Sequence, residues 1–88
     1  MTLTLLGRGY CHLCDDLLAA LAPFRAAWRI DIETVDVDTD AELERRYGDQ
    51  VPVLFSGPIS EGREICHYFL DPPRLVAALL AGGAIPVK

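Results

Sequence analysis

Residues 2–14 read TLTLLGRGYCHLC, and this stretch decides how the rest of the sequence is interpreted. The segment from Thr2 to Leu6 is short, apolar and compatible with a β-strand, and the Gly-Arg-Gly that follows breaks it. From Cys11 or His12 onward, apolar residues recur at three- and four-residue spacing (Leu13, Leu17, Leu21, Phe24 and Trp28), which is typical of an amphipathic helix. The stretch therefore predicts a strand that passes through a short loop into a helix.

Downstream, helix-like and strand-like segments alternate. The apolar stripe continues to Trp28, but Pro23 should kink or end the first helix near Ala22. A strand is expected over residues 30–37, where apolar and acidic residues alternate with one slip of register near Glu33-Thr34. A short helix should follow, opened by a capping box of Thr39 and Glu42 and ending near Tyr47. After it we expect a strand over 53–55, a hairpin turn over 56–62 and a strand over 64–69. The last helix should be capped by Asp71 and end at Gly82-Gly83, and its apolar face consists of Leu75, Val76, Leu79 and Leu80.

This element order, β-α-β-α-β-β-α, predicts one α/β domain over residues 1–88. A four-stranded mixed sheet with helices on both faces satisfies it, because βαβ crossovers place helices over a parallel strand pair. The length fits a single small core, and a hydrophobic share of 51% with 24% charged residues is ordinary globular usage.

The net charge of the chain bears on whether it binds nucleic acid. Eight basic residues against thirteen acidic ones give a net charge of −5, which argues against a general nucleic-acid surface.

No apolar run approaches the roughly 20 residues that span a bilayer, and the N-terminus has no basic signal-peptide region. We therefore expect a cytoplasmic protein with no membrane partner. In that reducing compartment, a Cys-x-x-Cys is more often catalytic or metal-binding than a structural disulfide.

The Cys11-His12-Leu13-Cys14 motif is the strongest chemical signal in the chain. Residues three apart share one face of a helix, so the two sulfurs can reach bonding distance. The unpaired N–H groups and positive dipole end at the helix start favour a thiolate at Cys11. We expect Cys11 to be the exposed nucleophile and Cys14 to be the buried thiol that resolves the mixed disulfide.

The alternative is half of a zinc site, which would need four ligands in all. The other candidate ligands are His12, Cys66 and His67. Cys66 and His67 are neighbours on an expected strand and point to opposite faces, so they cannot both join one cage. Spacing and context favour redox chemistry, with Cys66 as a small core residue.

The chain resembles the thioredoxin superfamily, and most closely its small glutaredoxin-like proteins. The residues that carry the resemblance are the CHLC motif after the first strand and Val51-Pro52-Val53 at the third, together with the element order. The resemblance implies a thioredoxin-like fold and a cis Pro52 packed beside the dithiol. It also implies that the backbone of Val51 binds an incoming peptide or glutathione.

The sequence departs from the glutaredoxin pattern at two places. His12-Leu13 stands where glutaredoxins favour Pro-Tyr, and Phe69-Leu70-Asp71-Pro72-Pro73 stands where they carry the Gly-Gly and acidic residues that hold the γ-glutamyl end of glutathione. Pro72 and Pro73 also lack the N–H groups that could bind a carboxylate at a helix start. We therefore expect protein disulfides to be better substrates than glutathione.

Three residues near the dithiol have open roles. Arg8 could favour the thiolate or bind a substrate carboxylate, or it could be a solvated loop charge. Tyr10 could wall the substrate site or be a packed loop aromatic, and His12 could tune the thiolate or be an exposed residue at the helix start.

Together these features predict a thiol–disulfide oxidoreductase. The expected catalytic residues are Cys11 and Cys14, and the expected substrate-binding residues are Arg8, Tyr10, His12, Val51 and Pro52. The expected partners are a disulfide-containing protein or a low-molecular-weight thiol, with an external reductant such as the glutathione or thioredoxin system. No prosthetic group or metal is implied, and a monomer is expected. The rival functions are a binding module with an idle dithiol and a metal-binding protein.

Overall fold

A computed structural model of the protein describes residues 1–87. Its strands, α-helices and short 3-10 helices (η) follow the order expected from the sequence, with the first helix divided in two. In chain order they are β1 (Thr2–Gly7), α1 (His12–Ala20), α2 (Ala22–Ala27), β2 (Asp31–Asp36), η1 (Val37–Thr39), α3 (Ala41–Tyr47), β3 (Val53–Ser56), η2 (Ile59–Glu61), β4 (Glu64–His67) and α4 (Pro72–Ala81).

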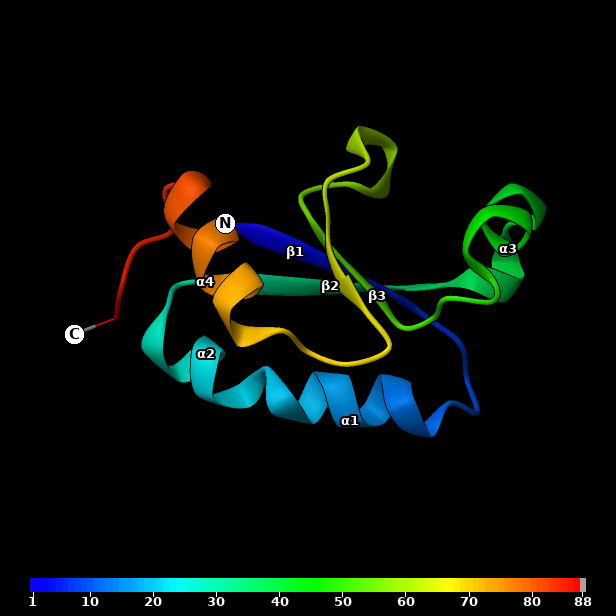
Figure 1. The fold of residues 1–88 in the computed structure, drawn as a ribbon, viewed down its shortest axis with the longest axis horizontal. Helices are drawn as coiled ribbons and strands as arrows, with labels where there is room; N and C mark the ends of the chain where they lie inside the picture. Colours follow the sequence, from blue (N-terminus) through cyan, green and yellow to red (C-terminus); the bar gives the residue numbers. More distant parts are fainter. Residues whose placement is uncertain (88) are drawn as a thin grey trace.

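The four strands form one mixed sheet in the order β2-β1-β3-β4. β1 runs parallel to β2 and antiparallel to β3, and β3 runs antiparallel to β4. Figure 1 shows α1 and α2 running along the sheet, with α3 at the end where β1 leads toward α1. The predicted mixed sheet is confirmed. Within residues 1–87, none of the helices has the length and apolar character needed to cross a bilayer.

Helices cover both faces of the sheet, and each face has its own core. Leu17 and Leu21 from the first helical segment and Leu75 and Leu79 from α4 pack with one set of strand residues, and Leu43 and Tyr47 of α3 pack against the other. In β1 the side chains of Leu5 and Leu6 belong to opposite cores, as alternation along a strand requires. Position 7 therefore faces the helix that carries the two cysteines.

The expected slip of register in the second strand is wrong. β1 and β2 pair without interruption from Thr2↔Asp31 to Gly7↔Asp36. Ile32 packs with the core under α1 and α4, and Val35 packs with the core under α3. Ile32 and Val35 are three positions apart because they are buried on opposite faces of a regular strand.

Two further boundaries and the burial of one residue differ from the sequence expectation. Asp40 rather than Thr39 caps α3, because its Oδ1 accepts hydrogen bonds from the N–H groups of Glu42 and Leu43. The fourth strand ends at His67 instead of residue 69. In α4, Leu75 and Leu79 are buried as expected, but Leu80 is 66% exposed.

The first helix is divided as Pro23 suggested. α1 ends at Ala20, and Pro23 lies in the first turn of α2, where the missing N–H of proline is tolerated. The N–H of Leu21 still donates to carbonyls of α1, which keeps the two segments end to end.

Candidate active site

The two cysteines of the CHLC motif stand at the start of α1. Cys11 is the N-cap residue with extended backbone (φ −129°, ψ 106°), and its Sγ accepts a hydrogen bond of 3.1 Å from the N–H of Cys14. The carbonyl of Cys11 accepts from the N–H of Asp15 at 3.2 Å, which closes the first helical turn. The helix start thus directs an N–H group at the Cys11 sulfur, which would stabilise negative charge there after reduction.

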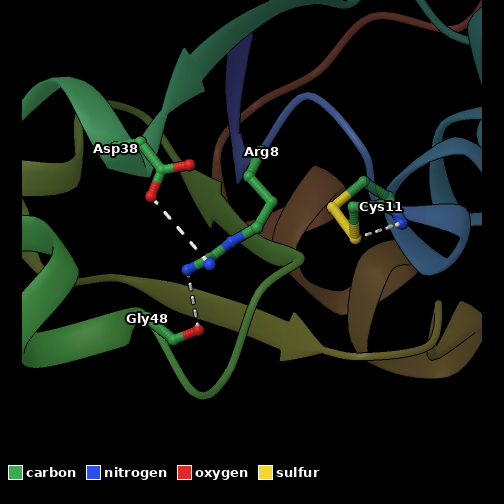
Figure 2. Close-up of a disulfide and its surroundings, with 5 residues drawn as sticks. Arg8, Cys11, Asp38 and Gly48 are labelled. Carbon is green, nitrogen blue, oxygen red and sulfur yellow. Dashed lines mark hydrogen bonds and ion pairs between the residues drawn. A yellow bond between two sulfur atoms is a disulfide. The ribbon is translucent and has the colours of Figure 1, made fainter.

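Cys11 and Cys14 are joined in a disulfide with their Cα atoms 5.2 Å apart (Figure 2). Cys14 is 8% exposed and belongs to the interior, whereas Cys11 is only partly buried. Of the two sulfurs, the one at the N-cap is therefore the one that an external disulfide can approach.

The strand register brings the Val51-Pro52 segment to the end of β1 on which Cys14 rests. A Cβ built on Gly7 would lie 3.0 Å from the Sγ of Cys14, so Cys14 sits directly on the end of β1. Leu6 pairs with Val53 in antiparallel register, so Pro52 is the first position beyond this pair on its segment, as Gly7 is on β1. Pro52 is buried and its peptide bond with Val51 is cis, which confirms the expected isomer.

Val51 leaves its backbone polar groups unused in this position. Among residues 1–87, neither its N–H nor its C=O pairs with another backbone group, while the next carbonyl, that of Pro52, accepts from the N–H of Tyr68 at 2.8 Å. A free donor and acceptor beside a dithiol can pair with an extended peptide, as a sheet edge does. The substrate-binding role of Val51 stays a prediction.

The guanidinium of Arg8 pairs with residues in and around α3. Its Nη2 donates to the Oε2 of Glu44 at 2.8 Å and to the carbonyl oxygen of Gly48 at 3.1 Å, and Asp38 lies 3.9 Å from Nη1. Figure 2 shows the guanidinium turned toward Asp38 and Gly48 and away from the disulfide. Glu44 and Asp38 would compete with any substrate carboxylate for this cation, so the expected roles of Arg8 stay predictions.

The two residues that flank Cys11 are both exposed. Tyr10 is fully exposed, which rules out the packed loop aromatic, and its role as a wall of the substrate site stays a prediction. His12 is the first residue of α1 and its side chain also faces solvent.

A hollow of about 310 Å³ opens on the other side of Cys14, between α1 and the edge strand β2. Gly7, Cys14 and Leu18 line it together with Thr34 and Asp36 of β2. Cys14 therefore borders this hollow on the β2 side of the molecule, although little of its surface is exposed.

The start of α4 offers few backbone donors. Pro72 and Pro73 have no N–H, and the N–H of Arg74 donates to the Oδ1 of Asp71 at 3.2 Å. The predicted cap at Asp71 is confirmed. The first three N–H positions of this helix are thus either missing or already used.

Cys66 lies outside the site. It is 3% exposed in β4 opposite Leu54, as expected for a small core residue, and burial raises the pKa of its thiol. Within residues 1–87, no three His, Cys, Asp or Glu side chains converge into a group that could hold a metal ion.

Sequence reasoning misses two residues that build the site. The sequence pattern marks Gly7 only as a strand break, although its lack of a Cβ makes room for Cys14. Tyr68, which pairs with Pro52, carries no local sequence signal; only the register of β3 and β4 reveals it.

Fold and site together define a thioredoxin-like α/β protein with a cysteine pair at the start of its first helix. The sequence model of the Glutaredoxin-like domain matches residues 2–80, which is most of the chain. The chain therefore belongs to the glutaredoxin-like domain family.

Solved structures share this fold. The solution structure of protein Ne2328 from Nitrosomonas europaea is 38% identical, with a TM-score of 0.76 over 86% of this chain and 87% of that one. The X-ray structure of protein XcR50 from X. campestris is 46% identical, with a TM-score of 0.69 over 90% and 96% of the two chains. A buckwheat glutaredoxin–glutathione complex is 22% identical, with a TM-score of 0.59 over 94% of this chain and 80% of that one, a likeness that shows the fold alone. No curated protein matches the chain.

Proposed function

We propose that the protein is a thiol–disulfide oxidoreductase that uses Cys11 and Cys14. The thiolate of Cys11 attacks one sulfur of a substrate disulfide, forms a mixed disulfide and releases the other substrate sulfur as a thiolate that takes up a proton. The thiolate of Cys14 then attacks the Cys11 sulfur, which releases the second substrate thiol and leaves Cys11–Cys14 oxidised. An external dithiol, or two molecules of a monothiol, returns the two electrons.

The observation that carries the proposal is the asymmetric cysteine pair at the start of α1. Cys11 accepts the N–H of Cys14 at its sulfur and is the more accessible of the two, and Cys14 is buried within reach of it. An accessible sulfur at a helix start with a resolving thiol one turn inside is the arrangement that exchange chemistry requires.

We further propose that protein disulfides are better substrates than glutathione. The free N–H and C=O of Val51 favour an extended peptide beside the dithiol. The start of α4 disfavours the γ-glutamyl carboxylate, because two prolines remove donors there and the Asp71 carboxylate takes a third. The proposed setting is a monomer in a reducing compartment, served by the glutathione or thioredoxin system.

Two measurements on the purified protein test this function. The Cys11–Cys14 reduction potential, measured against glutathione and thioredoxin couples, gives the direction of electron flow. Turnover is then compared between insulin, as a protein disulfide, and a peptide–glutathione mixed disulfide. We expect insulin to be the better substrate, Cys11→Ser to abolish both activities, and Cys14→Ser to trap a mixed disulfide at Cys11.

The outcomes separate the rival functions. A reversible Cys11–Cys14 bond without turnover of any disulfide would make the protein a binding module. Stoichiometric metal in the reduced protein would make it a metal-binding protein. Efficient turnover of the glutathione substrate would overturn the substrate preference and leave the oxidoreductase class intact.

A further inference from the structure

Tyr68 has an unusual backbone for its residue type. It is the one non-glycine residue within residues 1–87 with a positive φ, at 64°. This left-handed region suits glycine, and a bulky side chain in it stays there only when the surrounding contacts fix the conformation. The contacts that fix Tyr68 therefore indicate what the residue does.

Two hydrogen bonds from Tyr68 hold both ends of one short segment. Its backbone N–H donates to the carbonyl oxygen of Pro52 at 2.8 Å, and its hydroxyl donates to the carbonyl oxygen of Asp49 at 2.6 Å. Gln50 and Val51 lie between these two acceptors. The tyrosine thus bridges the segment that carries the free backbone groups of Val51.

The positive φ is what allows this bridge. In a continued strand, Tyr68 would share the face of Cys66, which is buried under α1 and α4. The left-handed turn ends β4 at His67 and sends the ring toward Asp49, where it also packs edge to face on His67 with ring centroids 4.8 Å apart. The N–H of Phe69 then donates to the His67 carbonyl at 2.8 Å, which closes the turn.

The segment held by Tyr68 lies next to the dithiol. Val53 pairs with both Leu6 and His67, so the positions one step beyond, Gly7, Pro52 and Tyr68, form one row across β1, β3 and the end of β4. Cys14 sits on the first member of this row. A shift of the Asp49–Pro52 segment would therefore move the Val51 backbone relative to the sulfurs.

We propose that Tyr68 is a positioning residue that fixes the Asp49–Pro52 segment so that Val51 can pair with the backbone of a peptide substrate while its disulfide meets Cys11. This proposal rests on the proposed function. It assigns Tyr68 to recognition of extended peptides and not to the sulfur chemistry, because these two hydrogen bonds go to the segment and its ring packs on His67, not on a cysteine.

The test measures formation of the mixed disulfide in the Cys14→Ser background, where the first step can be followed alone. One substrate is an extended peptide containing a disulfide, and the other is dithiobis(nitrobenzoate), a small aromatic disulfide without a peptide backbone. Tyr68→Phe removes only the hydroxyl bond. Tyr68→Gly also removes the ring, but glycine adopts the positive φ freely, so the turn after β4 should be kept.

We expect both variants to lower the rate with the peptide about three- to tenfold, the worth of one lost hydrogen bond, and to leave the rate with the aromatic disulfide unchanged. The NMR order parameters of the Gln50 and Val51 amides should fall in both. Tyr47→Phe is the matched control, because it makes the same chemical change in a ring that packs on Phe55 and shares a core with Val51, without the hydroxyl bond that Tyr68 makes to the segment.

Unchanged order parameters in Tyr68→Phe and Tyr68→Gly would overturn the positioning role, whatever the catalytic result. Lower order parameters with an unchanged peptide rate would overturn the role in substrate binding. An equal loss with both disulfides would place Tyr68 in the sulfur chemistry instead. If the parent protein with Tyr68 reacts with the aromatic disulfide but not with the peptide, the proposed preference for protein disulfides fails, and the order parameters still decide whether Tyr68 holds the segment.

Discussion

The sulfur of Cys14 rests on Gly7, with only 3.0 Å between Sγ and the place that a Cβ of residue 7 would occupy. The last residue of β1 therefore forms part of the floor beneath the disulfide. A glycine is needed here for space, not for backbone freedom.

Gly7→Ala should push Cys14 away from the sheet. We expect the oxidised protein to lose about 1–2 kcal/mol of unfolding free energy, because the added methyl group would stand only 3.0 Å from a sulfur that the disulfide holds in place. Gly9→Ala is the matched control, since a Cβ at residue 9 would have no neighbour within 4 Å, and it should stay within about 0.5 kcal/mol of the parent. Urea unfolding of the oxidised proteins checks this, and equal values for the two variants would contradict the close contact.

Cys66 should make stability pH-dependent above neutrality. Burial raises the pKa of its thiol, against smaller opposing effects of a backbone hydrogen bond with Asp71 and the charge of Arg74. The fold thus favours the neutral thiol. The free energy of unfolding that the neutral Cys66 thiol contributes is fully present below the unfolded-state pKa of about 8.5. It is lost as the pH rises from there toward the folded-state pKa, at about 1.4 kcal/mol per pH unit.

Unfolding free energies at pH 7 and pH 10 test this effect. We expect the parent to lose more stability between the two pH values than Cys66→Ala, since the alanine variant lacks the titrating thiol and the cavity it leaves costs the same free energy at both. Cys11 and Cys14 stay oxidised throughout and do not titrate. Parallel losses in the two proteins would show that Cys66 does not carry the dependence.

The Arg8–Glu44 pair should contribute little to stability. The side chain of Arg8 is 34% exposed and that of Glu44 is 49% exposed, so solvent screens their attraction. A double-mutant cycle with Arg8→Ala and Glu44→Ala should give a coupling of about 0.5–1 kcal/mol that shrinks in salt. Glu42→Ala serves as the control partner, because Glu42 pairs with Arg45, and its coupling to Arg8 should be close to zero.

Restoring the backbone donors of α4 should improve binding of glutathione. We expect the variant Asp71→Ser/Pro72→Ala/Pro73→Ala to bind S-methylglutathione about tenfold or more tightly than the parent, because each charge-assisted hydrogen bond is worth roughly 1.5–3 kcal/mol. Asp71→Ser alone keeps a helix cap and tests the loss of charge separately. Calorimetry measures both affinities without any redox step; no gain in the triple variant would remove the prolines as the cause of discrimination.

The element order could be predicted from the sequence because each segment carries its own periodicity or turn residues. The CHLC motif could be placed by its spacing and its position after the first strand, whereas the cis Pro52 is expected only from the resemblance to glutaredoxin-like proteins. The apparent slip near Glu33 could not be resolved, because a strand between two cores buries both faces, and periodicity alone does not say which core each apolar residue enters. The sequence pattern places the cap of α3 one residue early because Thr39 and Asp40 are both good N-cap residues, and the Thr39 hydroxyl instead donates to the carbonyl of Asp36.

The remaining site residues are set by tertiary contacts. The partner of Arg8 depends on how α3 docks, which brings Glu44 to a loop that is distant in sequence. Tyr68 ends β4 through a backbone conformation that tyrosine disfavours on its own, so a propensity argument extends the strand past it.

The reactivity of the cysteine pair and the choice of a substrate depend on folding to different degrees. The difference lies in the row formed by Gly7, Pro52 and Tyr68. The cysteine pair is closed within one helical turn, so its sulfur chemistry needs only a short local segment. The row needs three chain segments from the beginning, middle and end of the domain to be paired in register. A chain whose sheet has opened would keep a reactive dithiol and lose its choice of partner, which ties selectivity, rather than reactivity, to the integrity of the whole domain.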